Sequence, residues 1–417
     1  MSPVSAAAAP DAQQANWPQF GYDEGHTAYN PLEKTIATSN VSKLTIGWND
    51  QTIIQPSGIA YDTGVLFIDD MGQKKQGLYA LDATTGKKKW YANVNLNGGW
   101  GGFRAVSAVA AGMVVTPCSN GSTTKFLTGV CGVNATTGKI EWKDYCTEYQ
   151  GNPCPGLANG SDTSPSTDGK QIYVQITQGV NEQPDTLALN PKTGGTIWSI
   201  AGVYHCPDAG LGGEQPMPVA AGNVLAVLGC QGTSGGTEIC ALTTSSGAPT
   251  WCYQTQPYVQ TTIADTTKFY VVLEGGSTST IIAFNAKSGA QVWKTTVPAQ
   301  NGSALAVDKT QLYVEDGGNG LYAFNASNGK KVWSYTANGN MIVGGAIAVA
   351  NGIVYTNGGG GNNDNVAIAA FNAKTGKLIY STSTVSNGSS PAFGIVANGS
   401  VYTGCYTMCA FTLSSKK

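Results

Sequence analysis

The chain is dominated by one short unit that recurs seven times. Its first copy reads LYALDATTGKKKW (Leu78–Trp90), and its sixth reads LYAFNASNGKKVW (Leu321–Trp333). In every copy an alternating apolar run leads to an Asp, Asn or Thr, which can start a turn through its own side chain. A glycine follows, which accommodates the positive φ that such a turn often demands, and an aromatic residue stands four positions later. The unit therefore predicts a β-hairpin, formed by the third and fourth strands of a larger sheet.

A second pair of short strands is predicted upstream of each hairpin, for example in Ala105–Val115 and Gly345–Tyr355. Four short antiparallel strands that recur at about 40–50 residues are typical of propeller blades. An eighth copy begins at Cys409–Ser415 but lacks its aromatic strand, which Lys43–Asp50 at the other end of the chain can supply. The docking aromatics are then Trp48, Trp90, Trp142, Trp198, Trp251, Trp293, Trp333 and Tyr380. We predict an all-β, eight-bladed β-propeller of four-stranded antiparallel blades, with the last blade closed by the N-terminal strand so that no sheet edge stays open between the termini.

The unit Ala-x-(Asp/Asn)-x-x-Thr-Gly-x-x-x-Trp resembles the tryptophan-docking repeat of the PQQ-repeat (quinoprotein-like) propellers. The stretch Asn16–Thr35 resembles the lead-in of bacterial PQQ-binding-like repeat proteins. The Ala/Pro/Gln-rich residues 1–15 predict a disordered leader. The resemblance implies a single propeller domain over 16–417, with 16–40 as its lead-in. This superfamily contains dehydrogenases that depend on pyrroloquinoline quinone (PQQ) and non-catalytic envelope scaffolds, so the resemblance predicts the fold and leaves the function open.

The charge and hydropathy of the chain limit the classes of partner and the membrane association that can be expected. A net charge of −2 argues against nucleic acid or an anionic membrane surface. No apolar run reaches the length of a membrane-spanning helix. Residues 1–15 lack the basic and apolar regions of a signal peptide, so an intact one is not expected there.

Ten cysteines indicate a disulfide framework. Cys131, Cys240 and Cys409 each precede the turn position of their repeat by three residues, and Cys118, Cys230 and Cys405 end the preceding strands. We therefore expect the bonds Cys118–Cys131, Cys230–Cys240 and Cys405–Cys409, and among the remaining cysteines Cys146–Cys154 and Cys206–Cys252. An even number of paired cysteines predicts an oxidising compartment, so that the protein is secreted or periplasmic.

Trp100 and Arg104 are the most distinctive candidates for a binding site. Trp100 is outside the repeat frame, and Arg104 is the single arginine of the chain. Both precede a first strand, where the channel of a propeller opens. An aromatic face beside a guanidinium suits a flat anionic ligand such as a quinone carboxylate, through stacking and bidentate hydrogen bonds. The alternative is a tryptophan that packs beneath the arginine for stability.

Carboxylates at the same end of the predicted blades are candidates for a general base or a Ca²⁺ ligand. Asp162 and Glu214 stand out because they precede first strands at the level of Arg104. The others are Asp69, Asp70, Glu274, Glu315, Asp316 and Asp364. His26 is expected to be a structural hydrogen-bonding residue, and no partner can be assigned to His205.

Two functions follow from these features. The first is an exported quinoprotein-type oxidoreductase that acts on alcohol groups, with PQQ and Ca²⁺ at the channel mouth. The second is a non-catalytic scaffold that binds a protein or a glycan on its loop face. The quinoprotein dehydrogenases carry a vicinal disulfide over their cofactor, whereas this chain has no adjacent cysteines, and it also lacks a C-x-x-C-H haem motif.

Overall fold

The computed structural model describes most of the chain outside its two termini and several connections. The described residues are 15–54, 56–72, 75–94, 106–119, 128–145, 164–176, 185–200, 217–231, 236–255, 259–273, 275–276, 278–298, 304–316, 320–337, 344–358, 364–382, 385–386, 394–405 and 407–413. Everything below concerns these residues.

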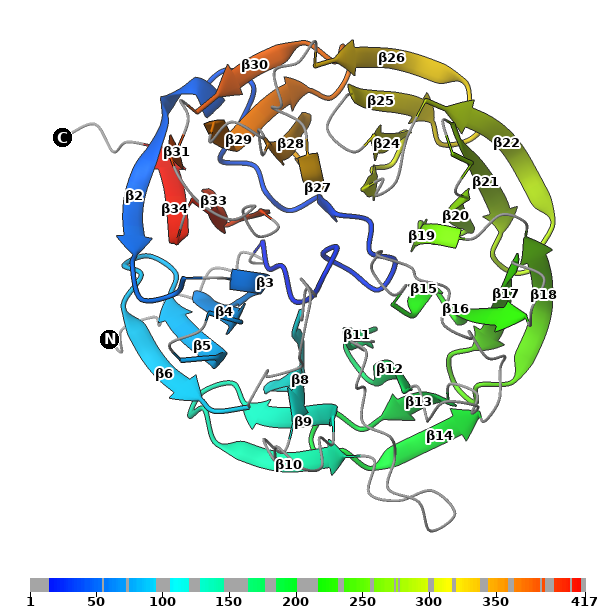
Figure 1. Ribbon diagram of the computed structural model, residues 1–417, viewed down its shortest axis with the longest axis horizontal. Helices are drawn as coiled ribbons and strands as arrows, with labels where there is room; N and C mark the ends of the chain where they lie inside the picture. Colours follow the sequence, from blue (N-terminus) through cyan, green and yellow to red (C-terminus); the bar gives the residue numbers. More distant parts are fainter. Residues whose placement is uncertain are drawn as a thin grey trace, which may run out of the picture.

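Eight four-stranded antiparallel sheets stand around a central axis, as predicted (Figure 1). Blade 1 consists of β3 (Pro56–Asp62), β4 (Val65–Asp70), β5 (Gly77–Asp82) and β6 (Lys88–Ala92). Blade 2 consists of β7 (Ala108–Ala110), β8 (Met113–Ser119), β9 (Thr128–Asn134) and β10 (Ile140–Tyr145). Blade 3 consists of β11 (Ser166–Thr167), β12 (Ile172–Ile176), β13 (Asp185–Leu189) and β14 (Thr196–Ile200). Blade 4 consists of β15 (Val219–Ala221), β16 (Val224–Gln231), β17 (Gly236–Thr243) and β18 (Pro249–Thr255).

The second half of the ring repeats this pattern. Blade 5 consists of β19 (Val259–Ala264), β20 (Lys268–Leu273), β21 (Ser279–Asn285) and β22 (Gln291–Val297). Blade 6 consists of β23 (Leu305–Val307), β24 (Gln311–Glu315), β25 (Gly320–Asn325) and β26 (Lys331–Thr336). Blade 7 consists of β27 (Gly344–Ala350), β28 (Ile353–Gly358), β29 (Asp364–Asn372) and β30 (Leu378–Ser381). Two short strands add to it: β1 (Tyr29–Asn30) pairs parallel with β27, and β31 (Val385–Ser386) pairs with the start of β29.

Blade 8 is built from both ends of the chain. Its inner strands are β32 (Ile395–Ala397), β33 (Ser400–Gly404) and β34 (Met408–Leu413), and its outer strand is β2 (Leu44–Asp50). The last strand of the chain therefore pairs antiparallel with a strand from the first fifty residues, with Trp48 opposite Ala410. This confirms the predicted closure. A single turn of 3₁₀ helix, η1 (Val41–Lys43), leads into β2.

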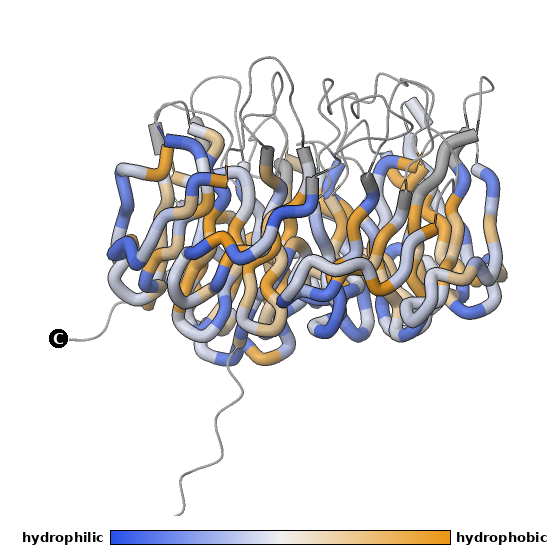
Figure 2. The backbone as a smooth tube through the Cα atoms, turned by 90° about the horizontal axis from the view of Figure 1, so that it is seen from below, coloured by the Kyte–Doolittle hydropathy of each residue, from blue (hydrophilic) through white to orange (hydrophobic). Residues whose placement is uncertain are grey.

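The core lies between the blades, where the faces of neighbouring sheets pack together. Figure 2 shows the hydrophobic residues along the strands and the hydrophilic ones at the turns below them. We call that end of the ring the turn face, because it carries the turns between first and second strands and between third and fourth strands. No helix in the described parts of the chain has the length and apolar character needed to cross a bilayer.

The docking aromatics join each blade to the next one. We call each of these contacts a latch. Each indole N–H donates a hydrogen bond to a backbone carbonyl in the third-to-fourth-strand turn of the next blade. The acceptors are Ala83 for Trp48, Ala135 for Trp90, Pro191 for Trp142, Thr244 for Trp198, Ala286 for Trp251, Ala326 for Trp293 and Ala373 for Trp333, at N···O distances of 2.8–3.1 Å. The Tyr380 hydroxyl donates to the Leu44 carbonyl at 3.1 Å and so joins blade 7 to β2.

The glycine of each repeat serves the latch of the preceding blade as well as its own turn. Gly329 has φ +69°, and a Cβ on it would lie 2.6 Å from Cε3 of Trp293. The repeat thus encodes both halves of the contact, a glycine that receives one indole ring and an aromatic residue that reaches the next blade. The turns themselves follow the prediction, since the Asp82 carboxylate accepts hydrogen bonds from the Thr85 backbone N–H at 3.0 Å and from its hydroxyl at 2.9 Å.

Two predicted disulfides are present, and two others are wrong. Cys118–Cys131 and Cys405–Cys409 are bonded. Cys240 is bonded to Cys252, with a Cα–Cα distance of 4.1 Å, which excludes both Cys230–Cys240 and Cys206–Cys252. Cys240 lies directly opposite Cys252 on the neighbouring strand, and opposite Val227 rather than Cys230 on the other side. Val227 and Cys230 are an odd number of positions apart, and residues on one face of a strand recur every two positions. Cys146 and Cys154 lie outside the described residues, so their bond stays a prediction.

Replacing Gly329 by Ala should destabilise the ring more than replacing Gly112 by Ala. Both glycines have positive φ, +69° and +80°, but a Cβ at Gly112 would meet no atom within 4 Å. The backbone strain should lower the free energy of unfolding by about 1–2 kcal/mol in both variants. The clash with Trp293 should add about 1–3 kcal/mol for Gly329→Ala alone. Denaturant unfolding measures the difference, and equal losses for the two variants would contradict the latch.

Candidate functional site

The central channel is the natural place for a site, and the chain itself crosses it. Residues 15–30, which we call the strap, run around the inside of the ring at its turn-face end (Figure 1, dark blue). The strap passes the innermost strands of all eight blades in chain order. It is the segment that the sequence indicated as a lead-in.

The strap makes at least one hydrogen bond with every blade. Trp17 exchanges two backbone bonds with Tyr61 of blade 1, at 2.8 and 2.7 Å. Five backbone N–H groups then donate to strap carbonyls at 2.7–2.8 Å: Val109 to Pro18, Ala220 to Glu24, Ala264 to Gly25, Val307 to Thr27 and Val349 to Ala28. In blade 3 the Gln19 side-chain amide replaces a peptide group and pairs with both the N–H and the C=O of Thr167 at 2.7 Å. In blade 8 the Asn30 side chain donates to the Val396 carbonyl at 2.8 Å.

The innermost strand of a blade is a sheet edge whose backbone groups need partners. The strap supplies such partners at equivalent positions all round the ring. It therefore fastens the inner circumference and crosses the channel at the turn face. A ligand of this channel would approach from the opposite end.

Among the titratable side chains of the strap with shifted pKa values, His26 and Asp23 are the two that change charge below pH 8. His26 is 2% exposed, its ring packs edge-to-face on Phe20 at 5.4 Å, and its Nε2 has no hydrogen-bond partner among the described residues. Burial lowers its pKa to about 3, so the imidazole is neutral at pH 7. Burial also raises the pKa of Asp23 to about 7, against hydrogen bonds from the Thr27 N–H and hydroxyl at 2.9 and 2.8 Å. His26 is structural, as expected, but through packing rather than through its Nε2.

Asp69, at the end of β4 away from the strap, joins blade 1 to blade 2. Its carboxylate accepts hydrogen bonds from the Ser107 N–H at 2.9 Å, from the Ser107 hydroxyl at 2.8 Å and from the Thr116 hydroxyl at 2.8 Å. Burial raises its pKa to about 6, although these donors oppose the rise. A carboxylate engaged in this way stabilises the blade interface and is poorly placed to accept a substrate proton.

The other acidic candidates divide into two groups. Asp70 and Asp316 are buried and accept hydrogen bonds from the backbone N–H groups of Gly72 and Gly320, and Asp316 also accepts one from the Tyr322 hydroxyl. Glu315 is buried at the end of β24. Trp100, Arg104, Asp162, Glu214, Glu274 and His205 lie outside the described residues, and so does the side chain of Asp364. The proposed binding pair therefore stays a prediction.

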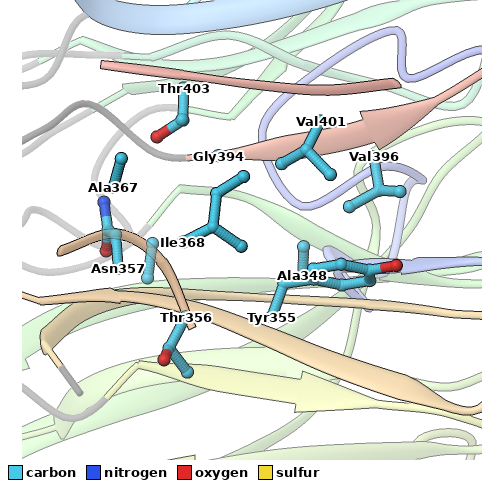
Figure 3. Close-up of a pocket in the computed structure, with 11 residues that line it drawn as sticks. Ala348, Tyr355, Thr356, Asn357, Ala367, Ile368, Gly394, Val396, Val401 and Thr403 are labelled. Carbon is cyan, nitrogen blue, oxygen red and sulfur yellow. The ribbon is translucent and has the colours of Figure 1, made fainter. Parts of the chain in front are cut away.

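A small cleft lies between blades 7 and 8 (Figure 3). Its walls come mainly from small or apolar side chains such as Ala348, Val396 and Val401, together with the bare backbone of Gly394. Asn357 and Thr403 lie at one end, and the Tyr355 hydroxyl points away from them. None of the described residues that line the cleft is charged.

Sequence reasoning missed the strap contacts and one recurrent pair. In three blades an Asp in the first turn accepts a hydrogen bond from a Tyr hydroxyl five residues later: Asp168–Tyr173 at 2.9 Å, Asp265–Tyr270 at 2.6 Å and Asp308–Tyr313 at 2.8 Å. The repeated Asp-x₄-Tyr spacing was the available signal. Elsewhere in the described chain, one group of three metal-binding side chains is found, Glu238, Cys240 and Cys252 on the outer half of blade 4.

Comparisons with known proteins agree with this architecture. A PQQ-repeat family model described as outer membrane protein assembly factor BamB matches residues 39–201 and 261–392. A search of curated protein sequences finds no match. Among solved structures, quinohemoprotein alcohol dehydrogenase from Comamonas testosteroni superposes with a TM-score of 0.70 and 14% identity, covering 97% of this chain and 81% of the other.

Two further structures show the same fold. BamB from Moraxella catarrhalis has a TM-score of 0.57 and 13% identity, covering 88% of this chain and 99% of the other. A europium-containing methanol dehydrogenase has a TM-score of 0.61 and 14% identity, covering 94% and 90%. At these identities the similarity establishes the propeller and does not transfer an activity.

His26 should make the protein less stable in acid. Unfolded histidine binds a proton near pH 6.5, whereas the folded chain does so only near pH 3. Between those values the free energy of unfolding should therefore fall by about 1.4 kcal/mol per pH unit on account of His26. Asp23 and Asp69 act in the opposite sense, because their pKa values of about 7 and 6 exceed the unfolded value. Their contribution is fully present below about pH 4 and is lost as the pH rises towards 7.

His26→Asn separates the two effects, because asparagine tolerates the positive φ of 52° at this position. The stability difference between wild type and variant should be constant above about pH 7.5. It should shift by about 2–3 kcal/mol in favour of the variant between pH 6.5 and 4.5. Denaturant unfolding at several pH values measures this shift. A difference that does not change with pH would mean that His26 is not buried in its neutral form.

Proposed function

We infer that this chain, which belongs to the PQQ-repeat family described as outer membrane protein assembly factor BamB, is an exported, rigid scaffold that binds a protein partner at the open end of its channel. The observation that carries this proposal is the strap, which is hydrogen-bonded to every blade and crosses the channel at the turn face. With the inner edges joined by the strap and the outer strands joined by the latches, the ring is a stiff support for the loops at its other end. The three described disulfides fit an oxidising, extracytoplasmic location.

The described polar groups also favour binding over catalysis. Near the channel, Asp69 is engaged between blades, Asp23 bonds within the strap, and His26 is neutral and buried. Each of these three side chains thus has a structural contact that accounts for it. The similarity to a BamB structure along 99% of its length supports the same choice.

A photo-crosslinking residue tests this proposal. Placed at position 100, which the sequence predicts to lie at the channel mouth, it should give one discrete protein adduct in cells of the source organism. Placed at Lys287, an exposed residue of a third-to-fourth-strand turn, it should give none. Adducts of equal yield from both positions, or a glycan in place of a protein, would overturn the proposal.

The second candidate is a quinoprotein-type oxidoreductase that acts on alcohols. The proximity of Trp100 to Arg104 in the sequence favours it, as does the fold shared with the alcohol dehydrogenase. The described residues do not supply a cradle for PQQ and Ca²⁺: the strap and inner strands offer backbone groups that already pair with each other, and Asp69 is engaged. We therefore derive no chemical step through either group.

Titration with PQQ and Ca²⁺ decides between the two candidates. A scaffold should show negligible affinity in the wild type and in Arg104→Ala and Trp100→Ala alike. A quinoprotein should bind PQQ, and either substitution should weaken binding by about tenfold to a hundredfold, through loss of charge-assisted hydrogen bonds or of a stacking face. Circular dichroism of each variant serves as the folding control.

A further inference from the structure

Blade 4 carries a group of sulfur and oxygen atoms that the propeller does not need for closure. Cys240 of β17 and Cys252 of β18 lie directly opposite each other and are disulfide-bonded. Glu238 lies two residues before Cys240, on the same face of the same strand. One carboxylate oxygen of Glu238 and both sulfur atoms lie within 4.8 Å of one another.

Glu238 has no visible compensation for its charge. The residue is 5% exposed, and its Oε2 has no hydrogen-bond partner among the described residues. A buried carboxylate without a donor or a counter-ion costs several kcal/mol of folding free energy, so that a group which neutralises it would be stabilising. Asp69, by contrast, is fully buried but accepts hydrogen bonds from the Ser107 N–H, the Ser107 hydroxyl and the Thr116 hydroxyl.

We propose that Glu238, Cys240 and Cys252 form a redox-gated binding site for a thiophilic divalent cation such as Zn²⁺. The oxidised disulfide cannot bind the ion. A dithiol reductant opens the site: it transfers two electrons and two protons to the two sulfurs, the S–S bond breaks, and the dithiol becomes a disulfide. The cation then displaces one proton from each thiol and binds two thiolates and the Glu238 carboxylate, with a fourth position left to water.

The ligand chemistry selects this class of ion. Two thiolates and one carboxylate suit Zn²⁺ or Cd²⁺, whereas Ca²⁺ and Mg²⁺ require oxygen ligands. Cys252 is exposed, so both the reductant and the ion can reach the site, while Cys240 and Glu238 are buried. The Cys118–Cys131 and Cys405–Cys409 disulfides have no third ligand beside them within the described residues, which makes them internal controls.

The test uses the full-length protein after mild reduction with dithiothreitol and removal of the reductant under argon. Alkylation mapping should show Cys240 and Cys252 reduced. Zn²⁺, measured against a chromogenic chelator, should bind with one additional equivalent relative to the oxidised protein. Cd²⁺ should give a thiolate charge-transfer absorption. Glu238→Gln should weaken Zn²⁺ binding about tenfold to a hundredfold without affecting reduction, and Cys118→Ser/Cys131→Ser should leave it unchanged.

Two results would overturn the proposal. The first is a Glu238→Gln variant that binds Zn²⁺ as tightly as the reduced wild type. The second concerns Cys252→His, which retains three potential ligands and needs no reductant: it should bind Zn²⁺ directly, and a folded Cys252→His protein without affinity for Zn²⁺ would exclude the site even if reduction unfolds the wild type.

Discussion

The tryptophan latch is the contact on which the propeller depends. Each blade buries its two faces only against its two neighbours. The stability of the ring therefore depends on every one of the interfaces between blades. The indole ring fills the wedge between two blades, its N–H satisfies a turn carbonyl of the next blade, and the positive-φ glycine leaves room for the ring. Because Tyr380 reaches β2 and Trp48 of β2 reaches blade 1, the same chemistry closes the circle across the junction of the termini.

The strap solves a different problem at the inner circumference. A blade ends at the channel in an edge strand, and eight such edges meet around one axis. Backbone N–H groups there would otherwise rely on water. The sixteen residues of the strap hydrogen-bond to a backbone group of the innermost strand in every blade. A segment that follows this curved path cannot keep a regular strand conformation. Gly21, with φ +64°, marks such a point, because a Cβ there would collide with His26. The latches therefore connect the blades through their outer strands, and the strap connects them through their innermost strands.

The repeat allowed the number of blades, the strand order, the closing strand and the latch residues to be predicted, because each depends on local pattern and on a fixed spacing. The strap could not be predicted, since its contacts join Asn30 to residues more than three hundred positions away and carry no periodicity. The Cys240 partner was missed for a related reason. Position along the repeat places Cys230 and Cys240 near each other, but the face of the strand depends on register, which becomes visible only in the paired sheet. The predicted binding residues Trp100 and Arg104 lie outside the repeat frame and outside the described residues.

These features bear on function through stiffness and access. Among the described side chains, Asp69 and Asp23 are engaged in hydrogen bonds and His26 packs on Phe20, so these three groups serve the structure. A scaffold needs a rigid framework. The strap fixes the blades at the turn face, and the end opposite the turn face is thereby held in a constant arrangement. Because the strap binds all eight blades, any movement of one blade relative to another would break hydrogen bonds at the centre as well as latches at the rim. This rigidity is the property that the proposed scaffold role requires.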